Sequence, residues 1–213
     1  MTDEITGLDS PIDVMYLIHK ALRAQGARAE DEVEKLDDGS SLQAFKLAFN
    51  AWATALVSHA ELEDQYMNDH FAPGATADAP DPAVEQLTGM LVAYEDEMLG
   101  QLLDSVQGVM TVLNDEIGPT SVITRTKQHL KAQIIGLRIA QEDHLETEEG
   151  LVLPALRQHM DEERQLAMAK GLLIDETADD TRWILQWIEP ELTPAEQKLL
   201  AEVETRCLET QIN

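Results

Sequence analysis

The sequence is poor in cysteine, in aromatic residues and in positive charge. Its 213 residues include a single cysteine, Cys207, which excludes a disulfide framework and a zinc site built on several thiolates. Aromatic residues make up 4%, and the 11 glycines and 8 prolines are too few for a collagen-like or low-complexity chain. Only 15 basic residues stand against 41 acidic ones, and the resulting net charge of −26 repels phosphate backbones and anionic lipids. We therefore expect no nucleic-acid partner and no membrane partner, but an attraction for cations.

Long hydrophobic runs are also missing. A membrane-spanning helix needs about 20 predominantly apolar residues, and no uncharged apolar stretch of that length is present. The first residues, Met1–Asp13, are acidic and polar, unlike a secretory signal. The sequence thus predicts a soluble, cytoplasmic protein. Its heavily charged, aromatic-poor composition favours a monomer or a weak homo-oligomer.

The apolar residues recur every three or four positions, which predicts an all-α fold. Asp9-Ser10-Pro11 is a helix start, and we expect the first helix to continue to about residue 29. Further helices are expected over 42–70, from about 83 to 116, and from about 120 to Pro154, which kinks or ends the last of them. We predict an antiparallel up-down-up-down four-helix bundle over residues 1–171. Residues 172–213 are predicted to add short C-terminal helices, around 183–187 and 194–207, as an extension of the same domain.

Two of the expected helices carry a continuous inward-facing line of residues in steps of three and four, as in the seam of a bundle. In the second helix this line is Leu42, Phe45, Phe49, Trp52, Leu56, His59, Glu63, Tyr66 and His70. In the fourth helix it is Ile123, Lys127, Leu130, Ile134, Leu137, Gln141, His144, Glu148 and Leu151.

Each seam contains a histidine and a glutamate four residues apart, His59 with Glu63 and His144 with Glu148. Residues at this spacing lie on one helix face. Burying an imidazole beside a carboxylate is costly unless another group satisfies both. Two such pairs on two helices therefore indicate a metal site. The alternative is an acidic bundle whose core histidines are satisfied without any metal.

Helix counting places a third histidine at the same level. His19 precedes the first interhelical turn by about as many residues as separate His59 from it, so at 1.5 Å per residue the two imidazoles lie within a turn of each other. The second and fourth helices run parallel in the predicted topology, which brings their His–Glu pairs to one level. Three histidines and two glutamates are thus expected to converge.

The third helix is expected to supply a sixth ligand from the same height. Counting back about 25 residues from His144 reaches the residues around Glu95, which borders the inward face of that helix. We therefore predict Glu95 as the sixth ligand. Glu97 and His129 are the next candidates.

The segment His144–Leu156, which reads HLETEEGLVLPAL, resembles the signature of the hemerythrin-like, HHE cation-binding domain family. The earlier His19 and the pair His59 and Glu63 fall where that pattern expects them, and the resemblance extends over about residues 11–160. It implies a non-haem di-iron centre with Glu63 and Glu148 as bridging carboxylates and the three histidines as terminal ligands. The third helix departs from the family pattern, because it offers Glu95 where a histidine is usual.

The implied cofactor is two iron ions with a bridging oxo or hydroxo group, and manganese is the alternative metal. Mixed imidazole and carboxylate ligands suit both metals. Three carboxylates against three imidazoles favour oxidation chemistry over reversible oxygen carriage. We expect a protein that reacts with dioxygen or peroxide, like a peroxidase or catalase, or with nitric oxide in oxidative or nitrosative stress. The alternative is a non-enzymatic sensor or storage module for oxygen, nitric oxide or iron. If the site turns over, Glu149 and Tyr94 are candidates for moving protons, from adjacency alone.

Overall fold

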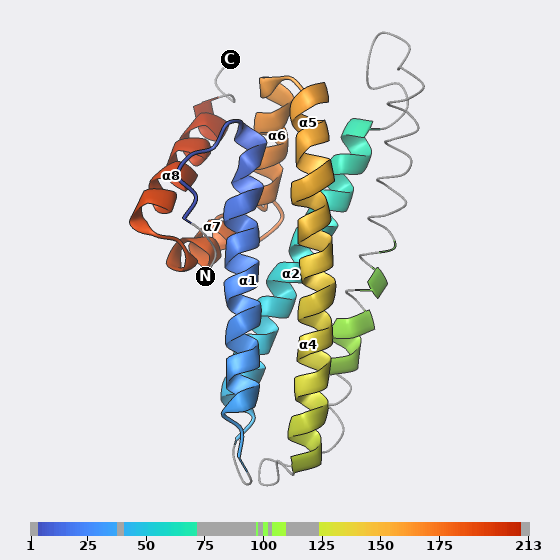
Figure 1. The fold of residues 1–213 in the computed structure, drawn as a ribbon. Helices are drawn as coiled ribbons and strands as arrows, with labels where there is room; N and C mark the ends of the chain where they lie inside the picture. The colour runs from blue at the N-terminus through green and yellow to red at the C-terminus, as the bar shows by residue number, and fades with distance from the viewer. Residues whose placement is uncertain are drawn as a thin grey trace. The chain divides into compact units, whose positions relative to one another are not determined.

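The computed structural model describes residues 4–37, 41–71, 97, 100–101, 104–109 and 124–209, without the side chains of residues 64–71, 124 and 125. Within these ranges every regular element is a helix and no strand occurs, which confirms the predicted all-α class (Figure 1). The described helices include none that is both long and apolar enough to cross a membrane. Most of the expected third helix lies outside the described residues, although those described between 97 and 109 are helical.

The chain divides into two compact units. One contains residues 1–21 and 145–213, and the other contains residues 22–144. Helices α1 (Val14–Glu34) and α4 (Thr124–Thr147) each begin in one unit and end in the other. Helix α1 is longer than predicted, because it continues five residues beyond Ala29, to Glu34.

In the unit of residues 22–144, the core follows the predicted seams. The buried apolar seam residues on α2 (Gln43–Phe71), together with the preceding Leu42, and on α4 are Leu42, Phe45, Phe49, Trp52, Leu56, Leu130, Ile134 and Leu137. Phe45 stacks on Phe49 with ring centroids 5.9 Å apart, and Phe49 meets Trp52 edge to face at 6.3 Å. Lys127 departs from the predicted line because its side chain is only partly buried. Its Nζ donates to the carbonyl oxygen of Glu34 at 2.7 Å, where α1 ends.

A glycine allows α1 to approach this aromatic cluster. A Cβ atom on Gly26 would lie 3.0 Å from Cζ2 of Trp52 and 3.1 Å from its Cε2. Such distances are too short for a carbon–carbon contact without movement of the indole. Gly26 therefore sets how closely α1 packs on Trp52 of α2.

In the unit of residues 1–21 and 145–213, the elements are shorter. After the 3-10 turn η1 (Pro11–Asp13) and the start of α1, they are the π-helical turn η2 (Glu148–Val152), α5 (Leu153–His159), α6 (Glu162–Leu173), α7 (Trp183–Ile188), the 3-10 turn η3 (Glu189–Glu191) and α8 (Pro194–Glu209). Helix α6 packs against α8 and η1, and α5 packs against η1 and η2. Leu200 and Val203 of α8 and Leu172 of α6 are among the buried side chains. The helical patterns expected around 183–187 and 194–207 correspond to α7 and α8.

Pro154 neither ends the fourth helical segment nor simply kinks it. Proline lacks an N–H and its ring clashes with the carbonyl four residues earlier, so a regular α-helical turn is disfavoured there. The chain instead forms the π turn η2, in which the Leu153 N–H donates to the carbonyl oxygen of Glu148, and then continues as α5. This wider turn changes which side chains face inward. Leu151, predicted on the buried line, is 63% exposed, whereas Val152 is buried.

In the same unit, a buried carboxylate of α8 joins this helix and the N-terminal segment to α1. Glu196 of α8 accepts hydrogen bonds from Nζ of Lys20 at 2.6 and 2.8 Å, from the Ile5 N–H at 2.9 Å and from the Thr193 N–H at 2.9 Å. Burial alone would raise the pKa of Glu196, but these donors lower that pKa to about 2. The contact fixes α8 and the N-terminal segment to the beginning of α1.

Lys20→Met should therefore lower the free energy of unfolding at neutral pH by about 2–4 kcal/mol, because it leaves the Glu196 charge buried without its strongest partner. Urea unfolding followed by circular dichroism measures this. The matched control, Lys35→Met, removes a surface pair with Glu32 and should leave the free energy of unfolding close to that of the wild type.

The same pair of proteins gives a pH test. The folded pKa of Glu196 is depressed from 4.5 to about 2, so its contribution is complete above pH 4.5 and is lost as the pH falls towards 2. The stability difference between wild type and Lys20→Met should shrink over that interval. A difference that does not change with pH would contradict this account of Glu196.

Candidate metal centre

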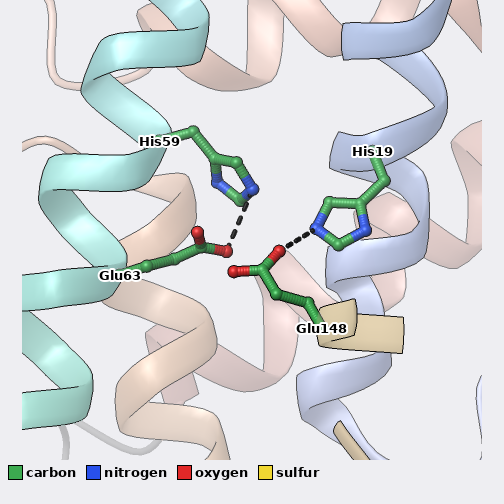
Figure 2. A group of neighbouring side chains, drawn as sticks. All are labelled: His19, His59, Glu63 and Glu148. Carbon is green, nitrogen blue, oxygen red and sulfur yellow. Dashed lines mark ion pairs between the residues drawn. The ribbon is translucent and has the colours of Figure 1, made fainter. Parts of the chain in front are cut away.

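The described part of the unit of residues 22–144 contains a buried His–Glu set. His59 and Glu63 lie one turn apart on α2, and His144 lies near the end of α4. Nε2 of His59 is 3.0 Å from Oε1 of Glu63 (Figure 2), and Nε2 of His144 is 3.4 Å from Oε2. All three side chains are less than a tenth exposed. The Glu63 carboxylate thus presents its two oxygens to two different imidazoles.

The protonation of Glu63 follows from these neighbours. Burial alone would raise the pKa of its carboxyl group. The charges and hydrogen bonds of His59 and His144 outweigh that effect and hold the pKa well below its ordinary value. Glu63 is therefore an anion at neutral pH, which is the form that binds a cation.

The unit of residues 1–21 and 145–213 contains a second set. His19 lies on α1, and Glu148 and Glu149 are the first two residues of η2. Nε2 of His19 is 3.2 Å from Oε2 of Glu148, and both side chains are fully buried (Figure 2). Nδ1 of His19 is 2.8 Å from Oε1 of Glu149, whose side chain is 24% exposed. Two consecutive carboxylates therefore face the two nitrogens of one imidazole.

The beginning of α1 is braced against α5 in the same unit. The Asp13 carboxylate accepts hydrogen bonds from the N–H groups of Asp9 and Ser10 at 2.9 and 3.0 Å, which caps the turn before α1. Nε of Arg157 on α5 also donates to Asp13, at 2.6 Å, and its Nη2 donates to the Tyr16 hydroxyl at 3.0 Å. These contacts fix the helix that carries His19 to the segment that follows Glu148 and Glu149.

A buried hydrogen bond joins α2 and α4 within the unit of residues 22–144. Nε1 of Trp52 donates to Oε1 of Gln141 at 2.6 Å. Trp52 lies seven residues before His59, and Gln141 lies three residues before His144. The bond therefore fixes the register of the two helices near the His–Glu set that they carry.

Five of the six predicted ligands lie among the described side chains. All of these are buried: His19, His59, Glu63, His144 and Glu148. Their role as metal ligands stays a prediction. Glu95 lies outside the described residues. Of its two alternatives, Glu97 is exposed and accepts a hydrogen bond from Gln101 at 3.5 Å, and His129 is exposed on α4.

The donor chemistry fits a metal of the predicted class. His19, His59, Glu63 and Glu148 each offer one nitrogen or oxygen ligand atom, and all four are buried (Figure 2). Imidazole nitrogen and carboxylate oxygen together suit iron and manganese, whereas thiolate would favour softer metals. The single thiol, Cys207 of α8, instead donates to the Leu166 carbonyl oxygen at 3.6 Å, and burial raises its pKa.

A family model described as Hemerythrin HHE cation binding domain matches residues 10–156. The match covers more than half of the chain, including every predicted ligand, and it confirms the resemblance found in the sequence. It ends before α6, α7 and α8. No curated protein and no solved structure matches the chain.

Gln141→Leu should destabilise the protein by about 1–3 kcal/mol in urea unfolding, because it leaves the buried Trp52 N–H without its acceptor. Gln128→Leu is the matched control, since Gln128 is exposed on α4, and its effect should stay within about 0.5 kcal/mol. Equal stabilities of the two variants would show that the Trp52–Gln141 bond contributes nothing.

Proposed function

The chain belongs to the hemerythrin HHE cation-binding domain family, and from this we propose that its two buried His–Glu sets bind a single centre of two iron ions. The family and the buried imidazole and carboxylate groups make the chain a metal-binding, hemerythrin-like protein. In the proposal, Glu63 and Glu148 are bridging carboxylates and His19, His59 and His144 are terminal ligands. Glu95 is the proposed sixth ligand.

The observation that carries the proposal is the position of Glu63 between two imidazoles. Its Oε1 faces His59 and its Oε2 faces His144. A carboxylate that uses its two oxygens in two directions is what a bridge between two metal positions requires. The family match supports the assignment of the two sets to one metal centre, because it covers the residues of both sets.

The donor set also favours iron or manganese over metals that prefer thiolate ligands. Nitrogen and oxygen ligands without thiolate are typical of iron and manganese centres in helical bundles. The net charge of −26 favours cation binding in general. We propose iron, with an oxo or hydroxo bridge as in the family resemblance, and manganese as the alternative.

The balance of ligands supports oxidation chemistry. Three carboxylates with three imidazoles supply more negative charge than a nitrogen-rich oxygen-carrying site, and anionic ligands stabilise the higher oxidation state of a metal. Two ferrous ions, when bound, would supply the two electrons that reduce dioxygen to peroxide or peroxide to water. The described ligands hold the site away from water, since each is less than a tenth exposed. We propose a catalase- or peroxidase-like protein of oxidative stress, or one that responds to nitric oxide.

A non-enzymatic sensor is the second candidate, and the contact between Lys20 and Glu196 favours it. Lys20 directly follows His19 on α1 and binds Glu196 of α8 at 2.6 Å. A ligand-dependent change at His19 would therefore arise one residue from the contact that fixes α8.

Loading with ferrous iron under anaerobic conditions should give two metal ions per chain, and Glu63→Ala or Glu148→Ala should each abolish most of the binding. If both carboxylates bridge one centre, the double variant should be no worse than either single variant, because coupled sites are not additive. Elemental analysis of the desalted protein measures the stoichiometry.

Two separate sites would give a different result, in which each single variant keeps half of the metal and the double variant keeps none. Glu61→Ala is the matched control, because Glu61 is exposed on α2 between the two predicted ligands. Glu95→Ala belongs to the same series. Unchanged occupancy and an unchanged spectrum in that variant would remove Glu95 from the ligand set.

Exposure of the ferrous protein to dioxygen should produce near-ultraviolet charge-transfer bands, and the oxidised protein should then decompose hydrogen peroxide catalytically. In the catalase-like reaction two peroxide molecules give one dioxygen and two waters, so no further reductant is needed. An oxygen electrode and loss of peroxide absorbance measure turnover. Charge-transfer bands without any peroxide turnover would favour the sensor over the enzyme.

A further inference from the structure

We propose that Glu149 is a positioning residue, which holds a proton on Nδ1 of His19 and thereby keeps the lone pair of this ring on Nε2, the nitrogen that faces Glu148. The inference rests on the proposed metal centre and adds to it a residue outside the predicted ligand set. The sequence alone indicates Glu149 only as a candidate for moving protons, because it lies next to Glu148.

The two contacts of the His19 ring are unequal. Nδ1 lies 2.8 Å from Oε1 of Glu149, within the range of a charge-assisted N–H···O hydrogen bond. Nε2 lies 3.2 Å from Oε2 of Glu148, at the long limit of that range. An imidazole that binds a metal ion through Nε2 keeps a single proton, on Nδ1. The shorter contact provides an acceptor for that proton in Glu149.

The π turn places both carboxylates on the same ring. Successive residues of an α-helix point about 100° apart, whereas a π turn holds more residues and rotates less at each step. Glu148 and Glu149 open η2, where the Leu153 N–H reaches back five residues to the Glu148 carbonyl oxygen. Their side chains therefore point in more similar directions than they would in an uninterrupted α4. The local cause is Pro154, which disfavours the regular turn.

The burial of the two carboxylates differs in the way that these roles require. Glu148 is fully buried with His19, as a metal ligand of an internal site should be. Glu149 is 24% exposed and lies at the edge of the set. In many metal sites the second nitrogen of a ligating histidine donates to a carboxylate, which fixes the ring and its tautomer. Without Glu149, the Glu148 carboxylate would favour the tautomer protonated on Nε2, which cannot bind a metal there.

The test compares Glu149→Ala and Glu149→Gln with Glu146→Ala. Glu146 is exposed at the end of α4, three residues before Glu149, and its removal changes the net charge by the same amount. Two quantities are measured in the full-length chain. Long-range proton–nitrogen NMR of the metal-free protein identifies the protonated nitrogen of His19, and anaerobic titration with ferrous iron gives the dissociation constant.

In wild type and in Glu146→Ala, we expect Nδ1 of His19 to carry the proton. In Glu149→Ala the proton should shift to Nε2, and the dissociation constant for ferrous iron should rise by about 10–100-fold. Glu149→Gln retains an oxygen that can accept from Nδ1, so it should keep the wild-type tautomer and bind iron within a few-fold of wild type. That rescue separates positioning from a loss of fold or of charge.

The proposal for Glu149 is overturned if wild-type Nδ1 carries no proton, or if Glu149→Ala matches Glu146→Ala in both measurements. Absence of iron binding by the wild type would instead refute the proposed metal centre. The NMR measurement needs no metal and would still decide the role of Glu149.

Discussion

The candidate centre depends on one constraint, namely that a carboxylate or an imidazole buried in a helical core needs a charged or hydrogen-bonding partner. An isolated buried charge costs several kcal/mol, roughly enough to unfold a marginally stable domain. Here His59 faces Glu63 and His19 faces Glu148, each pair almost fully buried. The pKa of Glu63 is low because His59 and His144 lie beside its carboxylate. The contacts that make burial tolerable thus also hold nitrogen and oxygen donors in place.

The sequence predicted the positions that obey a regular helical period. The seam of α2 is buried from Leu42 to Glu63, and that of α4 from Leu130 to His144 and on to Glu148 of η2, because side chains three and four residues apart share a face. The prediction fails at Leu151, which is exposed. Periodicity cannot anticipate the added residue of a π turn, although Pro154 marks where the regular turn becomes unfavourable. The prediction of Glu95 as the ligand on the third helix rests on counting residues alone, and Glu95 lies outside the described residues.

The sequence pattern could not predict contacts between residues that are far apart along the chain. The hydrogen bond between Glu149 and His19 joins two parts of the chain that no helical period relates. The pairing of Lys20 with Glu196 likewise depends on how α8 packs, which composition and spacing do not specify. Glu196 itself lies in an ordinary acidic first turn of a helix, and its burial becomes evident only in the structure.

The partners of the buried carboxylates divide them into two kinds. Asp13 and Glu196 bind the side chains of Arg157 and Lys20, which carry a full positive charge at neutral pH. Glu63 and Glu148 face imidazoles, which carry a full charge only when protonated. The first kind is compensated by the chain itself and fixes its helices. The second kind faces ring nitrogens that can bind either a proton or a metal ion. The same difference explains why arginine and lysine occur at the structural contacts and histidine occurs at the candidate centre.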